Sequence, residues 1–171
     1  MSTESAAAIT GDIAIALSFL AALGFGIGQV RSANRDRRER LTIETVRAMQ
    51  TRQLAEHFQR IGSQDLPSTF SALRALPPDE QVSIIHYAQQ MEMLGLMVYD
   101  GMIELALVER TLGDYVGFSW EKYKSFTYDR RKEDPYLNEY FEWLANRLDD
   151  YMRSNPRPPA HAAIAAQSEP R

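Results

Sequence analysis

The residue types that most often carry catalysis are sparse in this 171-residue chain and follow no known catalytic spacing. Its histidines are His57, His86 and His161, and none has a second histidine three or four residues away, as a helical zinc site requires. The chain contains no Glu-x-x-His motif, two of which would be needed for a di-iron site. The absence of cysteine excludes a thiol nucleophile. We therefore predict no catalytic residue, no metal and no cofactor, and expect a protein that is not an enzyme.

Four methionines lie close together in the sequence: Met91, Met93, Met97 and Met102. Thioethers bind soft metals such as Cu(I), but methionine is more often an adaptable filler of a hydrophobic core. We predict the second role for this group. His86 belongs to the same apolar segment, and we expect it to be a buried, hydrogen-bonded packing residue.

The best candidates for binding an anion or an acidic partner are Arg130 and Arg131, in the segment YDRRKEDPY at residues 128–136. Guanidinium groups bind phosphate and carboxylate through paired hydrogen bonds. The alternative is a solvated loop of mixed charge between two helices, which is the commoner role of such a segment. The residue types alone do not separate these two interpretations.

A glycine-rich stretch near the N-terminus, ALGFGIGQVRSANRDRRER at residues 22–40, raises the question of a phosphate-binding loop. The glycines read G-x-G-x-G, no lysine follows and no short strand precedes them, so the requirements of such a loop are not met. Residues 9–30 carry one charge, Asp12, and as a helix they would cross the ~30 Å hydrocarbon layer of a membrane. The stretch therefore predicts a transmembrane helix over residues 9–30. A cleaved signal peptide and a buried core helix are the alternatives.

Five arginines follow this apolar stretch directly. Positive charge beside a membrane span stays on the cytoplasmic side, so we expect residues 1–8 to form a short outer tail and the chain after Val30 to lie in the cytoplasm. The guanidinium groups are also expected to contact anionic lipid head groups, which makes membrane lipid a predicted partner. These residues are Arg31, Arg35, Arg37, Arg38 and Arg40.

Small residues on one side of the predicted span suggest a packing face. Ala21, Gly24 and Gly28 share a helical face, and the two glycines have the G-x-x-x-G spacing that lets membrane helices approach closely. We predict that this face packs against a second copy of the chain or against another membrane protein. The alternative is that glycine is simply common in membrane spans.

The rest of the chain has helical periodicity and no period-two alternation, which predicts an all-α fold. Residues 31–62 are expected to form a basic juxtamembrane stalk helix, residues 63–153 a small cytoplasmic helical bundle, and residues 154–171 a disordered tail. The segment 78–98 is the expected centre of the bundle, because one apolar face is continuous and further apolar residues widen it until most sides are buried. The face is Ile84, Tyr87, Ala88, Met91, Leu94, Gly95 and Val98, and the widening residues are Val82, Ile85, Met93, Leu96 and Met97.

Three segments of the chain resemble a bacterial family catalogued only as a domain of unknown function. They are LTIETVRAMQT at residues 41–51, MEMLGLMVYDGMIELALV at residues 91–108 and YLNEYFEWLANRLDDYM at residues 136–152. The resemblance implies a short outer tail, one membrane span, a basic stalk and a helical domain. It places the chain in the bacterial inner membrane as a single-pass protein with its N-terminus outside. It implies no reaction and no catalytic residue.

The net charge of −4 gives no sign of a nucleic-acid partner. The features together predict a membrane-anchored helical interaction or scaffold protein, whose partner is another protein or a second copy of the chain. Two alternatives remain open. One is an accessory subunit of a larger membrane complex, and the other is a membrane-tethered effector or enzyme that acts on lipid or nucleotide near Arg130 and Arg131.

Overall fold

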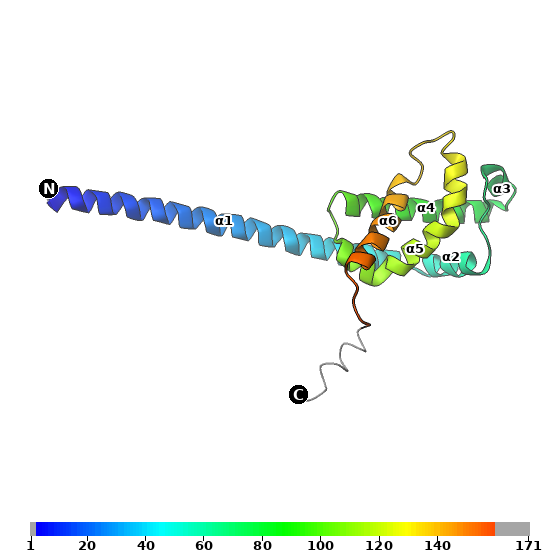
Figure 1. The fold of residues 1–171 in the computed structure, drawn as a ribbon, viewed down its shortest axis with the longest axis horizontal. Helices are drawn as coiled ribbons and strands as arrows, with labels where there is room; N and C mark the ends of the chain where they lie inside the picture. The colour runs from blue at the N-terminus through cyan, green and yellow to red at the C-terminus, as the bar shows by residue number, and fades with distance from the viewer. Residues whose placement is uncertain (1–2, 160–171) are drawn as a thin grey trace, which may run out of the picture. The chain divides into compact units, whose positions relative to one another are not determined.

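The computed structural model describes the backbone of residues 3–159 and the side chains of residues 18–159 (Figure 1). This part of the chain forms six helices and no strand, which confirms the all-helical prediction. The chain divides into two compact units, residues 1–41 and residues 42–171. The helices are α1 (Thr3–Met49), α2 (Arg52–Ser63), α3 (Phe70–Arg74), α4 (Pro78–Tyr99), α5 (Leu105–Arg130) and α6 (Glu139–Ser154).

The prediction of a transmembrane helix over residues 9–30 is wrong for the described part of the chain. None of the helices searched there combines the length and the apolar character that a membrane span needs. Residues 9–17 lie outside the residues whose side chains are described. The single-pass placement in the bacterial inner membrane, with the N-terminus outside and the bundle in the cytoplasm, depended on that span and is wrong with it.

The predicted terminal tails are described only in part. Residues 3–8 belong to α1, whereas residues 1–2 lie outside the described chain. At the other end, Ser154 closes α6 and residues 155–159 follow without regular structure. The remainder of the predicted tail, residues 160–171, lies outside the described chain.

A break after Met49 separates α1 from α2. Thr51 is the N-cap of α2, and its hydroxyl accepts a hydrogen bond from the Leu54 N–H at 3.2 Å. This bond satisfies one of the backbone donors that a helix leaves unpaired at its start. Residues 31–62 therefore fall in two helices, and the second of them belongs entirely to the unit formed by residues 42–171.

Helix α4 supplies much of the core of that unit. The buried residues of α4 are the seven of its predicted apolar face: Ile84, Tyr87, Ala88, Met91, Leu94, Gly95 and Val98. The prediction that α4 is buried on most sides is wrong, because Val82 is 64% exposed, Met93 57% and Ile85 41%. One long side of α4 therefore faces solvent.

Helix α6 packs against both α4 and α5 (Figure 1). The approach of α6 to α4 is closest at Gly95, where an added Cβ atom would lie 2.2 Å from the carbonyl oxygen of Tyr140. No side chain fits at that distance, so glycine is required at this crossing. On the inner face of α6, Phe141, Leu144 and Leu148 are completely buried.

Candidate functional site

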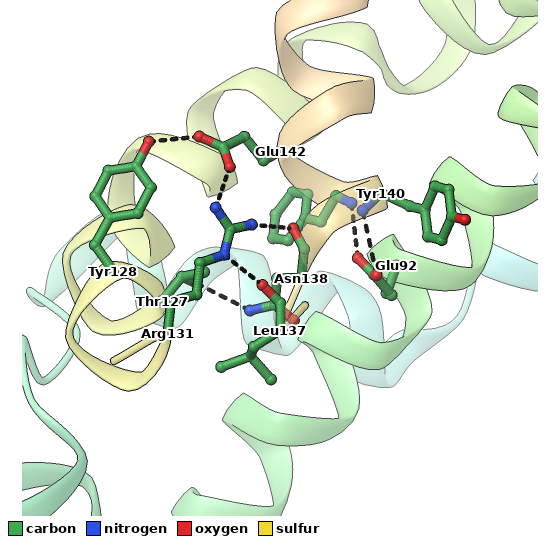
Figure 2. A network of polar contacts seen from close by, with 9 residues as sticks. Glu92, Thr127, Tyr128, Arg131, Leu137, Asn138, Tyr140 and Glu142 are labelled. Carbon is green, nitrogen blue, oxygen red and sulfur yellow. Dashed lines mark hydrogen bonds and ion pairs between the residues drawn. The ribbon is translucent and has the colours of Figure 1, made fainter. Parts of the chain in front are cut away.

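Arg131, one of the two predicted anion-binding residues, organises the connection between α5 and α6 (Figure 2). Its Nε atom donates a hydrogen bond to the Leu137 carbonyl at 2.8 Å, and its Nη2 atom donates to the Asn138 carbonyl at 3.1 Å. Its Nη1 atom forms an ion pair with Glu142, which also accepts a hydrogen bond from the Tyr128 hydroxyl. The guanidinium is thus occupied by groups of its own chain.

Asn138 and Glu92 complete this network at the start of α6 (Figure 2). Asn138 has a left-handed backbone conformation, with φ of 53°, and its side-chain amide donates to the Thr127 hydroxyl at 2.9 Å. From α4, the Glu92 carboxylate accepts hydrogen bonds from the N–H groups of Tyr140 at 3.2 Å and Phe141 at 2.8 Å. A carboxylate at the positive end of a helix stabilises it. Glu92 therefore caps α6 from another helix.

Arg130, the second predicted anion-binding residue, is also engaged within the chain. Its guanidinium carbon lies 4.3 Å from the centre of the Phe70 ring, and its Nη1 atom pairs with Glu133. The neighbouring Asp129 carboxylate accepts a hydrogen bond from the Phe70 N–H at 3.2 Å. These contacts hold the start of α3 against the end of α5. Anion binding by Arg130 and Arg131 stays a prediction, and each arginine already has a carboxylate partner.

A buried polar cluster joins α2, α4 and α5. The Nδ1 atom of His57 lies 3.1 Å from the Ser83 hydroxyl, and the Nε2 atom lies 2.8 Å from the Tyr123 hydroxyl. The Tyr123 hydroxyl donates its proton to the Ile84 carbonyl at 3.0 Å, so it accepts from His57. This assigns His57 as the neutral tautomer with hydrogen on Nε2. The imidazole also stacks on Tyr87, with ring centres 4.4 Å apart.

The pKa values of this cluster favour uncharged side chains. Burial, together with the nearby Arg60 guanidinium, lowers the pKa of His57 to about 4. Burial outweighs the opposing effect of the hydrogen bond with Ser119 and raises the pKa of Tyr87 to about 12. Burial also raises the pKa of Tyr123 well above its usual range. Groups fixed in their neutral forms and fully bonded to one another are suited to packing rather than to proton transfer.

The packing role predicted for His86 belongs instead to His57. His86 is exposed on α4, and its Nδ1 atom lies 3.5 Å from the side-chain amide of Gln53. His57 is 4% exposed, and its position on α2 gave no comparable apolar signal in the sequence. No group of three or more potential metal ligands occurs among the residues that the structure describes.

The predicted packing residues of α1 lie on an open helical face. A Cβ atom added at Gly24 or Gly28 would meet nothing within 4 Å, and Ala21 is exposed. The arginines that follow are also exposed. Lipid contact by these arginines and helix packing by the small residues stay predictions. The arginines are Arg31, Arg35, Arg37, Arg38 and Arg40.

Large apolar side chains gather on the opposite side of the same helix. Phe19, Leu23, Ile27 and Val30 recur with the repeat of about 3.6 residues per turn and so share one face, and their exposed fractions run from 47% to 64%. We call these four residues the α1 stripe. In the sequence these residues lie within the predicted membrane span, and their hydrophobicity alone does not mark them as a distinct face.

A second apolar surface lies in the unit formed by residues 42–171. A groove of about 460 Å³ runs between the end of α1 and the outer side of α4. No charged residue lines this groove, which we call the α4 groove. Its lining residues are Thr45, Ala48, Met49, His86, Gln89, Gln90, Met93, Leu94 and Met97. The signal that could have found it is the near-absence of charge in α4, where Glu92 is the only charged residue between Glu80 and Asp100.

Comparison with known proteins gives a family but no activity. No curated protein and no solved structure matches the chain. Residues 8–148 match the family described as a domain of unknown function (DUF4760). This match spans both compact units and confirms the family resemblance drawn from the sequence, while the single-span and bacterial features attached to that resemblance are not shown. The chain belongs to the DUF4760 family of domains of unknown function.

Proposed function

We propose that the protein is a helical interaction module that assembles through pairing of the α1 stripe with that of a second copy. The observation that carries this proposal is the exposure of four large apolar side chains on one face of a helix. Contiguous exposed apolar surface marks interaction sites in proteins. Burial of an aliphatic or aromatic side chain contributes roughly 1.5–3 kcal/mol, so pairing the stripes gives a substantial free energy.

The spacing along α1 supports a helix–helix partner. Phe19, Leu23, Gly26 and Val30 are separated by four, three and four residues, the pattern with which one helix packs along another. The glycine in this row leaves room for a large side chain of the opposing helix. Most of the stability of a helix comes from packing of its apolar face, and pairing would supply such packing along residues 19–30.

The charge that follows the stripe favours an antiparallel pair. Residues 31–40 contain five arginines against Asp36 and Glu39, a net charge of +3. In a parallel pair these basic segments would lie side by side and repel each other, whereas in an antiparallel pair they lie at opposite ends. The charge pattern therefore selects one of the two ways of pairing identical stripes.

An enzymatic role finds less support. The buried cluster around His57 is neutral and internally bonded, and the Arg130 and Arg131 guanidinium groups are paired with Glu133 and Glu142. An effector site would need polar groups aimed at a substrate rather than at each other. The interaction role needs only the exposed surfaces described above.

Sedimentation equilibrium of the purified full chain tests the proposal. We expect a dimer whose dissociation constant rises at least about 100-fold in the double variant Leu23→Asp/Ile27→Asp, because each of the two copies loses two apolar side chains worth roughly 1.5 kcal/mol or more each. Phe25→Asp is the matched control, since Phe25 is 75% exposed and lies on the other side of α1. It should leave the dissociation constant within about twofold.

Three results would contradict this proposal. A full chain that stays monomeric across the concentration range would exclude self-assembly. Equal weakening by Phe25→Asp and by the double variant would mean that the α1 stripe is not the contact surface. Stronger weakening by Phe25→Asp would transfer the contact to the small-residue face of Ala21, Gly24 and Gly28.

A further inference from the structure

The outer side of α4 is a second surface that the pairing of α1 does not use. Val82, Ile85 and Met93 are between 41% and 64% exposed along this side. The α4 groove continues the same surface toward the end of α1, where Met49 and Ala48 form its other wall. Its volume of about 460 Å³ falls in the range of sites that hold several side chains of a ligand.

The charge along the segment that contains α4 has one sign. Residues 75–109 contain six carboxylates and neither lysine nor arginine. Of these carboxylates, Glu92 caps α6 and Glu109 pairs with Arg157. Asp79 and Asp100 are exposed at the two ends of α4 and Glu104 is half-exposed at the start of α5.

The wall supplied by α1 does not change this balance. Glu44 and Arg47 carry opposite charges there, and the residues that line the groove are uncharged. A ligand in the α4 groove therefore meets an apolar floor and an excess of negative charge along α4. Such a surface attracts positive charge and repels acidic partners.

The composition of the groove indicates the shape of the partner. Met49, Met93 and Met97 line it, and methionine side chains adapt to differently shaped apolar ligands at binding surfaces. A groove beside an exposed helix accepts the apolar face of an amphipathic helix, which presents anchors three, four and seven residues apart. Glutamine side chains at residues 89 and 90 can donate to and accept from polar groups at the edge of such a helix.

We propose that the α4 groove is a docking site for a basic amphipathic helix of a partner protein. The apolar face of that helix lies on Met93, Met97 and Met49, and its lysine or arginine side chains meet Asp79 and Asp100. This role goes beyond assembly through α1 and does not depend on it, because the two surfaces share no residue. It also gives the methionine-rich segment a binding function in addition to core packing.

Fluorescence anisotropy with a labelled synthetic helix tests this proposal on the full chain. The probe is a peptide of about 18 residues, or five turns, with leucine on one face and arginine elsewhere. A matched peptide carries glutamate at every arginine position. We expect saturable binding of the arginine peptide that weakens with added salt, and at least tenfold weaker binding of the glutamate peptide.

Two variants locate the binding surface. Val82→Lys/Met93→Lys should weaken binding of the arginine peptide at least tenfold, because both positions are exposed and the new charges repel it. Ile43→Lys is the matched control, since Ile43 is 45% exposed and does not line the groove. Three results would each overturn the proposal. They are equal affinity for the two peptides, equal binding of the arginine peptide by the double variant and the native chain, and no binding of either peptide.

Discussion

A single glycine decides how closely α4 and α6 approach. Because a Cβ atom at Gly95 would lie 2.2 Å from backbone oxygen of Tyr140, Gly95→Ala must push the two helices apart. Overpacking costs typically 1–3 kcal/mol, more than the roughly 1 kcal/mol that alanine gains over glycine in a helix. We therefore expect Gly95→Ala to lower the free energy of unfolding, measured in urea, by up to about 2 kcal/mol.

The control for this change is another helical glycine. A Cβ atom at Gly117 in α5 would meet nothing within 4 Å. Gly117→Ala should therefore raise stability by roughly 0.5–1 kcal/mol. If both variants changed stability equally, the close approach at Gly95 would not be the cause.

Glu92 is the residue on which the start of α6 depends. Removing its carboxylate in Glu92→Ala leaves the N–H groups of Tyr140 and Phe141 without their acceptor. Loss of a helix cap costs about 0.5–2 kcal/mol, and partial burial of the freed donors adds to this. We expect thermal unfolding to show that Glu92→Ala lowers the free energy of unfolding by about 2 kcal/mol. The control Asp114→Ala changes an exposed residue and should lower it by less than about 0.5 kcal/mol.

His57 makes the fold sensitive to mild acid. Its pKa is about 4 in the folded chain against 6.5 for the free side chain, so the unfolded chain binds a proton first as pH falls. The free energy of unfolding is therefore highest, as far as His57 is concerned, above pH ~6.5. It falls progressively toward pH ~4, by up to about 3 kcal/mol. Urea unfolding at a series of pH values measures this slope.

Substitution separates His57 from the other titrating groups. His57→Phe should flatten the slope between pH ~6.5 and ~5, whatever its effect on stability at pH 7. An unaltered slope in His57→Phe would show that another group is responsible.

At the scale of elements, helical periodicity predicted the buried residues of α4 correctly but not the apolar residues that stay exposed to solvent. The seven buried residues of α4 follow from helical spacing alone, since these positions share one face. The exposure of Val82, Ile85 and Met93 does not follow, because hydrophobicity says nothing about how many neighbouring helices are available to cover a surface. Only the fold shows that, within the described chain, these three side chains remain largely uncovered.

The polar network at the start of α6 was beyond sequence reasoning for a related reason. Arg131 and Glu92 were separated by 39 residues in sequence and carried no common motif, yet both hold the first turn of α6. Side-chain caps supplied from another helix have no local signature. The sequence therefore pointed to Arg130 and Arg131 as candidates for binding an anion. It did not predict that Arg131 holds the loop before α6.

At the scale of the whole molecule, the α1 stripe and the α4 groove are both uncharged surfaces of the same chain. The first offers a repeating row of large side chains, which suits an identical helix in the opposite direction. The second is a methionine-lined depression with acidic surroundings, which suits a basic helix of another protein. The proposed assembly through one surface and the proposed recruitment through the other would together make the protein a scaffold.

Disulfide cross-linking measures the pairing of α1 most directly, because the native chain has no cysteine. In an antiparallel pair centred on the stripe, Phe19 of one copy lies opposite Val30 of the other. Mixing Phe19→Cys with Val30→Cys should therefore give a disulfide-linked dimer between the two variants, while each variant alone should link poorly. Linking of each variant to itself would contradict the antiparallel arrangement. Phe25→Cys is the control for chance collisions. If no mixture gave a higher yield of disulfide-linked dimer than this control, assembly through the α1 stripe would be contradicted.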